Sequence, residues 1–136
     1  MGSLRSGSGS GMEEARLPTV DADEACALLS AATHQYLDVR MWEDFDKGHV
    51  AGARNVPYYL SVTPHAKEKN PHFAEQVSAL YPKDQRLIVG CRSGIRSKLA
   101  TADLISAGFK NVRNLEGGYL SLLRSTNQHH HHPAAA

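Results

Sequence analysis

One stretch of the chain decides its fold: Leu87-Ile88-Val89-Gly90-Cys91-Arg92-Ser93-Gly94-Ile95-Arg96-Ser97. Its first residues form a short apolar run, which is typical of a buried strand. A basic turn containing a glycine follows from Cys91 to Arg96, and a helical pattern begins near Ser97. A thiol at such a junction faces the backbone N–H groups of the turn and the positive end of a helix. Both favour the thiolate, which is the nucleophilic form of cysteine.

Outward from this stretch, short apolar strands alternate with helical patterns. The sequence predicts strands at 36–39, 54–57, 86–89 and 111–115. It predicts helices after an N-cap at Asp21 and at 42–47, 72–81, 95–107 and 119–124, with a loop over 61–71. Such alternation predicts an α/β fold with a parallel sheet covered on both faces. Function in such sheets lies beyond the carboxyl ends of the strands, which is where Cys91 falls.

Length and composition limit the alternatives. The chain has 136 residues, 41% of them hydrophobic, and a net charge of +1. We expect one folded domain at 16–125, without binding to nucleic acid or to a membrane. No apolar run approaches the roughly 20 residues of a spanning helix, and no signal-peptide core is visible. Cytoplasm is therefore the default expectation, with an organelle reached through a removed targeting peptide left open.

The two ends have unusual compositions. Residues 1–15 are rich in Gly and Ser and are interpreted as a flexible leader of the kind that an expression vector adds. Residues 126–136 contain four consecutive histidines and three alanines, and are interpreted as a disordered His/Ala tail. Neither end enters the fold prediction.

The chain has two cysteines, Cys26 and Cys91. Two cysteines make neither a disulfide framework nor a zinc site of thiolates, so no metal and no cofactor is expected. Such usage fits a reducing compartment, where a thiol stays reactive. Cys26 lies in an apolar helical stretch and is interpreted as a small buried hydrophobe.

The residue types of the loop suit anion binding. Gly94 allows a sharp turn and a close approach of ligand to backbone. Successive N–H groups form a concave anion site around the sulfur. Arg92 and Arg96 add planar cations suited to oxyanions of sulfur or phosphorus. Ser93 and Ser97 can donate hydroxyl hydrogen bonds, or Ser97 can cap the helix. The loop contains no general base, which disfavours a cysteine protease.

Two further motifs accompany the loop from Cys91 to Arg96. The one before it runs from Asp38-Val39-Arg40 through Glu43-Asp44-Phe45 to Gly48-His49-Val50-Ala51-Gly52-Ala53-Arg54-Asn55-Val56-Pro57, and the one after it is Glu116-Gly117-Gly118-Tyr119. With the first, second and third motifs in this order, the chain resembles the rhodanese homology domain from about Val20 to Leu123.

The resemblance implies a three-layer α/β/α fold with a central, mostly parallel, five-stranded sheet. It also implies a single-domain sulfurtransferase, in which Cys91 accepts a sulfane sulfur as a persulfide and passes it to cyanide or a thiol. Its partners would be these small molecules, and the protein would be a monomer or weak dimer. In the family the loop amides, here those of Arg92, Ser93, Gly94, Ile95 and Arg96, stabilise the charge of the persulfide.

Other residues of the first motif are predicted to be structural. Asp38 and Arg40 could pair and brace neighbouring loops, and His49 could fix its turn through a backbone hydrogen bond. Gly48 and Gly52 are predicted to supply turn conformations, and Trp42 to pack rather than to stack on a ligand.

Two alternatives stay open beside the sulfurtransferase. Cysteine phosphatases keep one residue more between cysteine and arginine than the four found here, which disfavours that activity. A rhodanese-like arsenate reductase remains the second hypothesis, and a non-catalytic interaction module the third. Ser93 stands where mammalian-type thiosulfate enzymes carry a second basic residue, which weakens the expectation of a strong thiosulfate preference.

Overall fold

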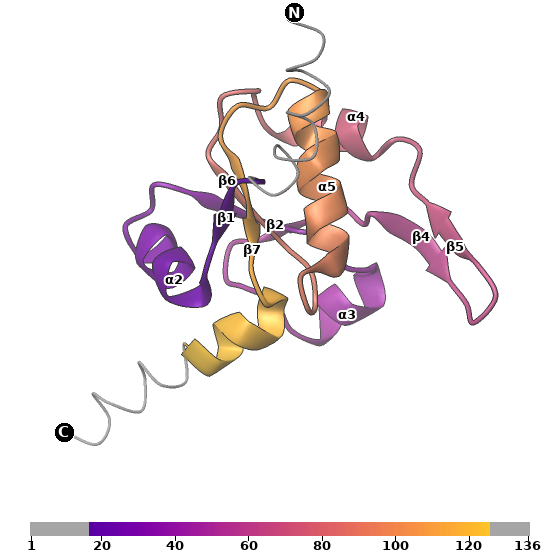
Figure 1. The fold of residues 1–136 in the computed structure, drawn as a ribbon, viewed down its shortest axis with the longest axis horizontal. Coiled ribbons are helices and arrows are strands. Elements are labelled where there is room, and N and C mark those ends of the chain that lie inside the picture. Colours follow the sequence, from indigo (N-terminus) through magenta and orange to yellow (C-terminus); the bar gives the residue numbers. More distant parts are fainter. Residues whose placement is uncertain (1–16, 126–136) are drawn as a thin grey trace, which may run out of the picture.

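A parallel sheet of five strands forms the centre of the protein in the computed structural model, which describes residues 17–125 (Figure 1). Its strands, in spatial order, are β1 (Thr19–Val20), β7 (Val112–Leu115), β6 (Leu87–Gly90), β2 (Gln35–Asp38) and β3 (Arg54–Asn55). Every neighbouring pair in this sheet is parallel. The predicted parallel sheet of five strands is therefore confirmed. The predicted leader at 1–15 and tail at 126–136 lie outside the described residues.

Helices cover both faces of the sheet. They are α2 (Ala22–Ser30), α3 (Trp42–Lys47), α4 (Phe73–Leu80), α5 (Ile95–Ser106) and a terminal helix over 118–125. One apolar cluster joins α4 and α5 to alternate residues of β2 and β6, and a second joins α2 and the terminal helix to the residues between them. Because successive strand residues point to opposite faces, two clusters mean two covered faces. The three-layer α/β/α architecture follows from them.

The central strand β6 explains why the fold forms around residues 87–90. All four of its residues are buried, since β6 has a partner strand on each side and a helical layer on each face. Burying Leu87, Ile88 and Val89 contributes roughly 1.5–3 kcal/mol for each side chain. The N-cap prediction at Asp21 is also confirmed, because its carboxylate accepts a hydrogen bond of 2.8 Å from the Glu24 N–H.

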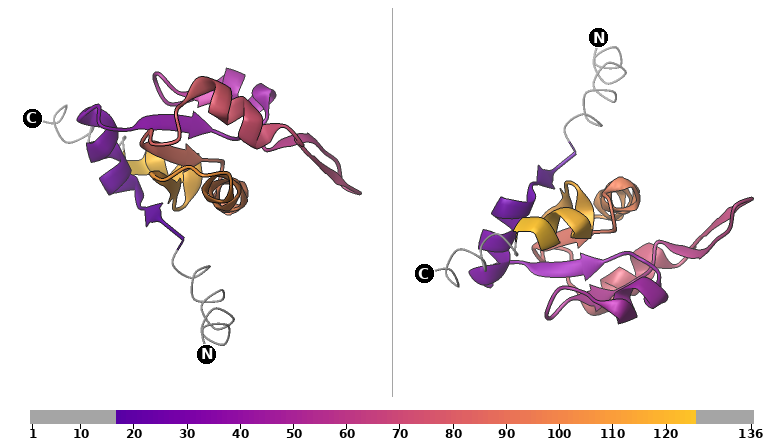
Figure 2. Two further views of the ribbon diagram at one scale, coloured as in Figure 1. Left: turned by 90° about the horizontal axis from the view of Figure 1, so that it is seen from above. Right: turned by 90° about the horizontal axis from the view of Figure 1, so that it is seen from below.

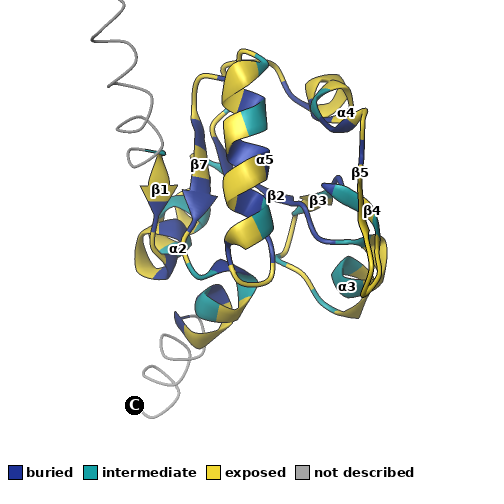
Figure 3. Ribbon diagram, turned by 45° about the vertical axis from the view of Figure 1, so that its right-hand side comes forward, coloured by how far each residue is buried: buried dark blue, intermediate teal, exposed yellow. Residues whose placement is uncertain are grey.

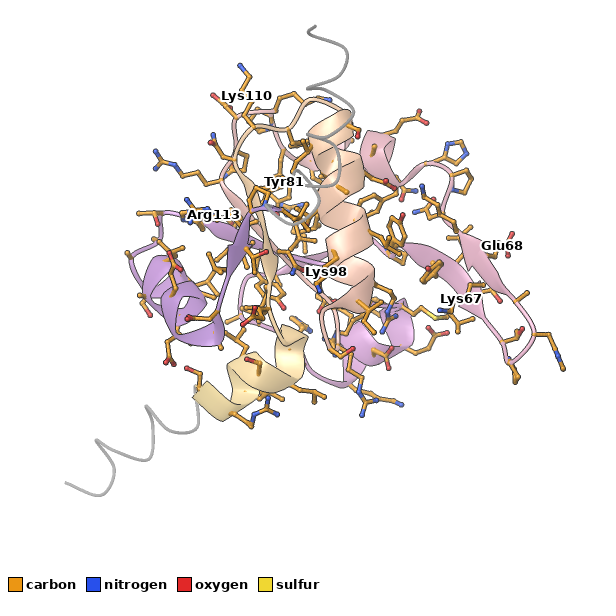
Figure 4. All side chains as sticks on the ribbon, viewed as in Figure 1. Lys67, Glu68, Tyr81, Lys98, Lys110 and Arg113 are labelled. Atoms are coloured by element: carbon orange, nitrogen blue, oxygen red, sulfur yellow. The ribbon has the colours of Figure 1, made fainter. Side chains whose placement is uncertain are left out.

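The predicted loop at 61–71 is wrong at 61–62 and 67–69, which are strands. The chain there forms an antiparallel hairpin of β4 (Tyr59–Val62) and β5 (Lys67–Lys69), which extends away from the sheet in Figures 1 and 2. Thr63 closes the turn, because its hydroxyl oxygen accepts hydrogen bonds from the N–H groups of His65 and Ala66. The hairpin is largely exposed (Figure 3), and Lys67 and Glu68 project from it (Figure 4). Because the hairpin has no buried face, its sequence lacks the alternation of apolar and polar residues from which strands are predicted.

Two smaller expectations have different outcomes. Trp42 does pack, with its ring centroid 5.9 Å from that of Phe45, although the side chain is 58% exposed. Gly48 has φ 161°, which is extended backbone and not a special turn, whereas Gly52 has φ 79° and does adopt the predicted turn conformation. No helix within residues 17–125 is long and apolar enough to cross a bilayer.

Candidate active site

Cys91 lies at the carboxyl end of the central strand, as the sequence predicts. It follows Gly90 directly, and β2 and β7 lie on either side of the strand that carries it. The residue is 1% exposed. The position is the usual place of a functional group in a parallel sheet, and the thiol there is enclosed by protein.

Two backbone N–H groups point at the Cys91 sulfur. Gly94 donates to Sγ at 3.0 Å and Ser97 at 3.3 Å, and the Cys91 thiol itself lies 3.5 Å from the Ser97 hydroxyl oxygen. Both donors belong to the start of α5, where N–H groups have no partner within the helix. Of the five residues predicted to supply amides, Gly94 alone directs its amide to Sγ in this structure. The second donor is the amide of Ser97, one residue beyond that set, for which the sequence predicted a hydroxyl hydrogen bond or a helix cap.

Gly94 is required by the backbone of the loop. Its φ of 107° is in the left-handed region that side chains disfavour, and it immediately precedes α5. A β-carbon there would lie 3.3 Å from the Gly117 nitrogen. The loop can therefore close over the sulfur only with glycine at this position.

The remaining predicted loop residues lie on the outside of the turn. Arg92, Ser93 and Ile95 are exposed, and Arg96 is partly buried. Neither arginine forms a salt bridge with any residue of the described 17–125. Two unpaired guanidinium groups beside a nucleophile favour an anionic ligand, because each fork matches the geometry of an oxyanion.

The third motif packs on the back of this loop. The N–H groups of Tyr119 and Leu120 donate to the carbonyl oxygens of Cys91 and Arg92 at 2.7 and 3.3 Å. Gly118 approaches so closely that a β-carbon would overlap the Arg92 carbonyl group and lie 2.6 Å from the Cys91 oxygen. The terminal helix thus holds the carbonyl side of the loop, while α5 holds the sulfur side.

The predicted pair of Asp38 and Arg40 is confirmed. The guanidinium binds the carboxylate with two nitrogens, the closest at 2.7 Å, and also donates to the Gly48 carbonyl oxygen at 2.7 Å. Burial disfavours the charge on Arg40, but the hydrogen bonds and negative charge of Asp38 outweigh it, so the pKa of Arg40 is raised. The same guanidinium lies 4.4 Å from the centre of the Tyr119 ring. Tyr119 therefore connects the first motif to the loop of Cys91.

His49 has the predicted structural role. Its Nδ1 lies 2.8 Å from the Phe45 carbonyl oxygen, and its ring stacks on that of Phe45 with centroids 3.7 Å apart. Both contacts fix the chain after α3. Within the part of the chain that the structure describes, no hydrogen bond connects His49 to the loop of Cys91.

The second cysteine belongs to the opposite face of the sheet. Cys26 is partly buried and packs against the cluster of α2 and the terminal helix, with its sulfur 3.8 Å from the Ser125 hydroxyl oxygen. Cys91 belongs to the other cluster. Residues 17–125 also contain no group of three or more His, Cys, Asp or Glu side chains that could hold a metal ion.

Comparisons with known proteins identify the family of the chain. A family model described as "Rhodanese-like domain" matches residues 21–124. Thiosulfate sulfurtransferase 18 of Arabidopsis thaliana is 48% identical over 105 residues, which are 76% of this chain and 76% of the relative. Protein HIGH ARSENIC CONTENT 1, mitochondrial, of the same plant is 44% identical over 74% of this chain and 59% of its own length.

A solved structure has a similar fold. Human single-domain sulfurtransferase TSTD1 superposes with a TM-score of 0.61 and 29% identity, over 79% of this chain and 96% of that one. The family match covers the described fold from the start of α2 into the terminal helix, with β1 outside it, and all three motifs that meet around Cys91 lie inside it. The chain therefore belongs to the rhodanese-like domain family.

Proposed function

We propose that the protein is a sulfurtransferase that moves a sulfane sulfur from a small anionic donor, such as thiosulfate, to a thiol or cyanide through a persulfide on Cys91. The observation that supports it most directly is the setting of the sulfur. Two N–H groups at a helix start point at it, and it is flanked in sequence by arginines that form no ion pair with the described part of the chain. Relatives named thiosulfate sulfurtransferase support the same reaction class.

In the first half-reaction, the Cys91 thiolate attacks the outer sulfur of thiosulfate. The new S–S bond forms as the donor's S–S bond breaks, and sulfite leaves with the electron pair. This step needs no proton from the protein, which matches a loop without a general base. Arg92 and Arg96 would bind the donor's oxyanion, since both belong to the loop and neither guanidinium group is ion-paired with a residue of 17–125.

In the second half-reaction, cyanide or a thiolate attacks the outer sulfur of the persulfide. The persulfide S–S bond breaks, its electron pair returns to Cys91 Sγ, and the product is thiocyanate or a new persulfide. The N–H groups of Gly94 and Ser97 stabilise the leaving thiolate, as an oxyanion hole stabilises oxygen. The two steps predict ping-pong kinetics.

The natural setting follows from the chemistry of the acceptor. A thiol acceptor requires a reducing compartment, so cytoplasm and the interior of an organelle both fit the proposal. Ser93 adds no charge between the two arginines, so we expect the loop to accept anionic donors other than thiosulfate as well. No cofactor enters either half-reaction, and we propose that the protein acts as a monomer or weak dimer.

Intact-mass measurement tests the persulfide. After incubation with thiosulfate, the protein should gain the mass of one sulfur atom and lose it on addition of cyanide. Cys26→Ser is the matched control and should gain the same mass, whereas Cys91→Ser should gain none. A gain that survives in Cys91→Ser, or none in the unaltered protein with thiosulfate or mercaptopyruvate, would contradict the proposal.

Arsenate reduction is a second candidate activity. The relative whose name refers to high arsenic content gives the specific reason to test it. Thiosulfate and arsenate would bind at the same loop, in which four residues separate Cys91 from Arg96. Arsenite formation from arsenate should be measured with glutathione as the source of two electrons, on the preparation used for sulfur transfer. Arsenite formation that depends on Cys91, without sulfur transfer, would replace the first proposal.

A further inference from the structure

Asn114 lies directly behind the candidate active site. It is on β7, its side chain is fully buried, and its Oδ1 is 2.5 Å from the hydroxyl oxygen of Ser97. Its Nδ2 has no hydrogen-bond partner within residues 17–125. A buried amide without a partner for its N–H groups costs free energy, so its presence beside a reactive thiol calls for an explanation.

The Ser97 hydroxyl faces more acceptors than it can serve. Its oxygen is 3.1 Å from the Gly94 carbonyl oxygen and 2.5 Å from Asn114 Oδ1, and both can only accept. A hydroxyl has one hydrogen to donate. In this orientation of the amide, one of the two carbonyl groups therefore lacks a donor from Ser97, while the N–H groups of Asn114 are unused.

A half-turn of the Asn114 carboxamide removes this conflict. The turn exchanges oxygen and nitrogen without moving any other atom. Nδ2 then donates to the Ser97 oxygen, and the Ser97 hydrogen is free for another acceptor. The cost is a carbonyl oxygen with fewer partners, which buried sites tolerate better than an orphaned N–H.

The charge on Cys91 decides which orientation is favoured. As a thiol, Cys91 can donate its hydrogen to the Ser97 oxygen, 3.5 Å away. As a thiolate it has no hydrogen and accepts, so a third donor besides the Gly94 and Ser97 N–H groups becomes useful. The Ser97 hydroxyl can be that donor once its oxygen is held by Asn114.

We propose that Asn114 is a positioning residue that acts on the Cys91 sulfur through Ser97, by donating its side-chain N–H to the Ser97 oxygen and so directing the Ser97 hydrogen to the thiolate. This role rests on the proposed function for its purpose, because the thiolate attacks in the first half-reaction and leaves in the second. The contacts themselves do not depend on which sulfur donor is used.

Alkylation of Cys91 tests the proposal without any sulfur-transfer assay. In a Cys26→Ser background, Cys91 is the sole thiol of the chain, and its rate of reaction with iodoacetamide at neutral pH reports thiolate supply. Asn114→Asp keeps the shape but replaces the donor with acceptors, and should slow alkylation about tenfold, the size of one lost hydrogen bond. Asn111→Asp, the same change at an exposed site, should leave the rate within about twofold.

A double mutant separates action through Ser97 from a direct effect of the new carboxylate. In a Ser97→Ala background, Asn114→Asp should cause no further slowing. The same tenfold slowing there, or equal rates for Asn114→Asp and Asn111→Asp with Ser97 present, would overturn the role. If Asn114→Asp does not fold, the side-chain amide protons of Asn114 should be followed by NMR as Cys91 ionises. Their shift should require Ser97, and a shift that persists in Ser97→Ala overturns the role.

The outcomes also separate this role from the proposed function. Slower alkylation in Asn114→Asp that depends on Ser97, in a protein that transfers no sulfur, would keep the positioning role and remove the sulfurtransferase. Sulfur transfer by the unaltered protein, together with an unchanged alkylation rate in Asn114→Asp, would keep the sulfurtransferase and remove the positioning role.

Discussion

The backbone N–H of Tyr119 donates to the carbonyl oxygen of Cys91 over 2.7 Å. This bond joins the residue that carries the reactive sulfur to the first turn of the terminal helix. The ring of the same tyrosine lies under the Arg40 guanidinium, which is paired with Asp38. Residues from three distant parts of the sequence thus fix the shape of one short loop.

Gly118→Ala should disturb the loop of Cys91 more than an alanine substitution of another glycine that also has a positive φ. Gly118 has φ 65°, and a β-carbon there would overlap the Arg92 carbonyl group. Gly52, with φ 79°, has open space around it and is the matched control. Gly52→Ala should cost about 1–2 kcal/mol of stability from strain alone, with activity retained.

Gly118→Ala should cost more stability than that and reduce sulfur transfer more than tenfold, because the loop must move. Urea denaturation and initial rates measure the two effects. Equal losses in both variants would show that the close approach of Gly118 to the loop has no functional importance.

Arg40→Ala should destabilise the protein by about 3–5 kcal/mol, because it leaves the Asp38 carboxylate buried without its partner. Arg113→Ala is the control, since its contact with Glu24 is 3.6 Å long and both side chains are about half exposed. That substitution should change stability by less than about 1 kcal/mol. Denaturant midpoints of the two variants give the comparison, and a similar small loss in both would refute the importance of the buried pair.

Arg96→Ala should raise KM for thiosulfate by about tenfold, the effect of one lost charge-assisted contact to the donor. Folding should be little affected, because Arg96 has no ion pair within residues 17–125. Lys98→Ala removes an exposed cation from the same helix (Figure 4) and should leave KM within about twofold. If both substitutions raise KM alike, the donor is attracted by the general positive charge of α5 and not by a specific contact with Arg96.

Stability should fall steeply at alkaline pH. Burial raises the pKa of Tyr36, and to a lesser degree those of Tyr58 and Tyr81, above the ordinary value of about 10. The folded state then keeps phenol protons that the unfolded chain has lost, so the stabilisation is complete below about pH 10 and decreases as the pH rises above it.

Tyr36→Phe should make that alkaline decrease shallower. The Tyr36 hydroxyl has no hydrogen-bond partner within the described residues, so its removal should leave stability at neutral pH equal or higher by about 1 kcal/mol. Thermal unfolding between pH 7 and about 11 measures both effects. If stability decreases with pH as steeply in Tyr36→Phe as in the unaltered protein, then Tyr36 ionises without unfolding the core.

The sequence predicted the elements whose side chains are buried in a regular pattern. The apolar run before Cys91 and the periodicity at 72–81 and 95–107 reflect contacts with the core, and the structure places a strand and two helices there. The pairing of Asp38 with Arg40 was predictable because two residues of opposite charge two positions apart at a strand end can meet locally.

Contacts between distant segments left no such signal. Asn114 and Ser97 meet because β7 lies beside β6 under α5, and neither residue belongs to a motif of paired polar side chains. Trp42 is exposed although its residue type favours burial, because α3 presents it to solvent. Exposure of this kind depends on the packing of the whole fold rather than on the residue or its neighbours in sequence.

The tip of the hairpin of β4 and β5 is a place where the chain can accept inserted residues. This tip, at 63–66, is wholly exposed, and the base of the hairpin is held by the Asn70 N–H donating to the Tyr58 carbonyl oxygen at 2.8 Å. Insertions and circular permutation succeed at exposed tips whose backbone carries no buried contacts. A reporter peptide or an affinity tag can therefore be inserted at 64–65, where it would leave the sheet and the loop of Cys91 intact.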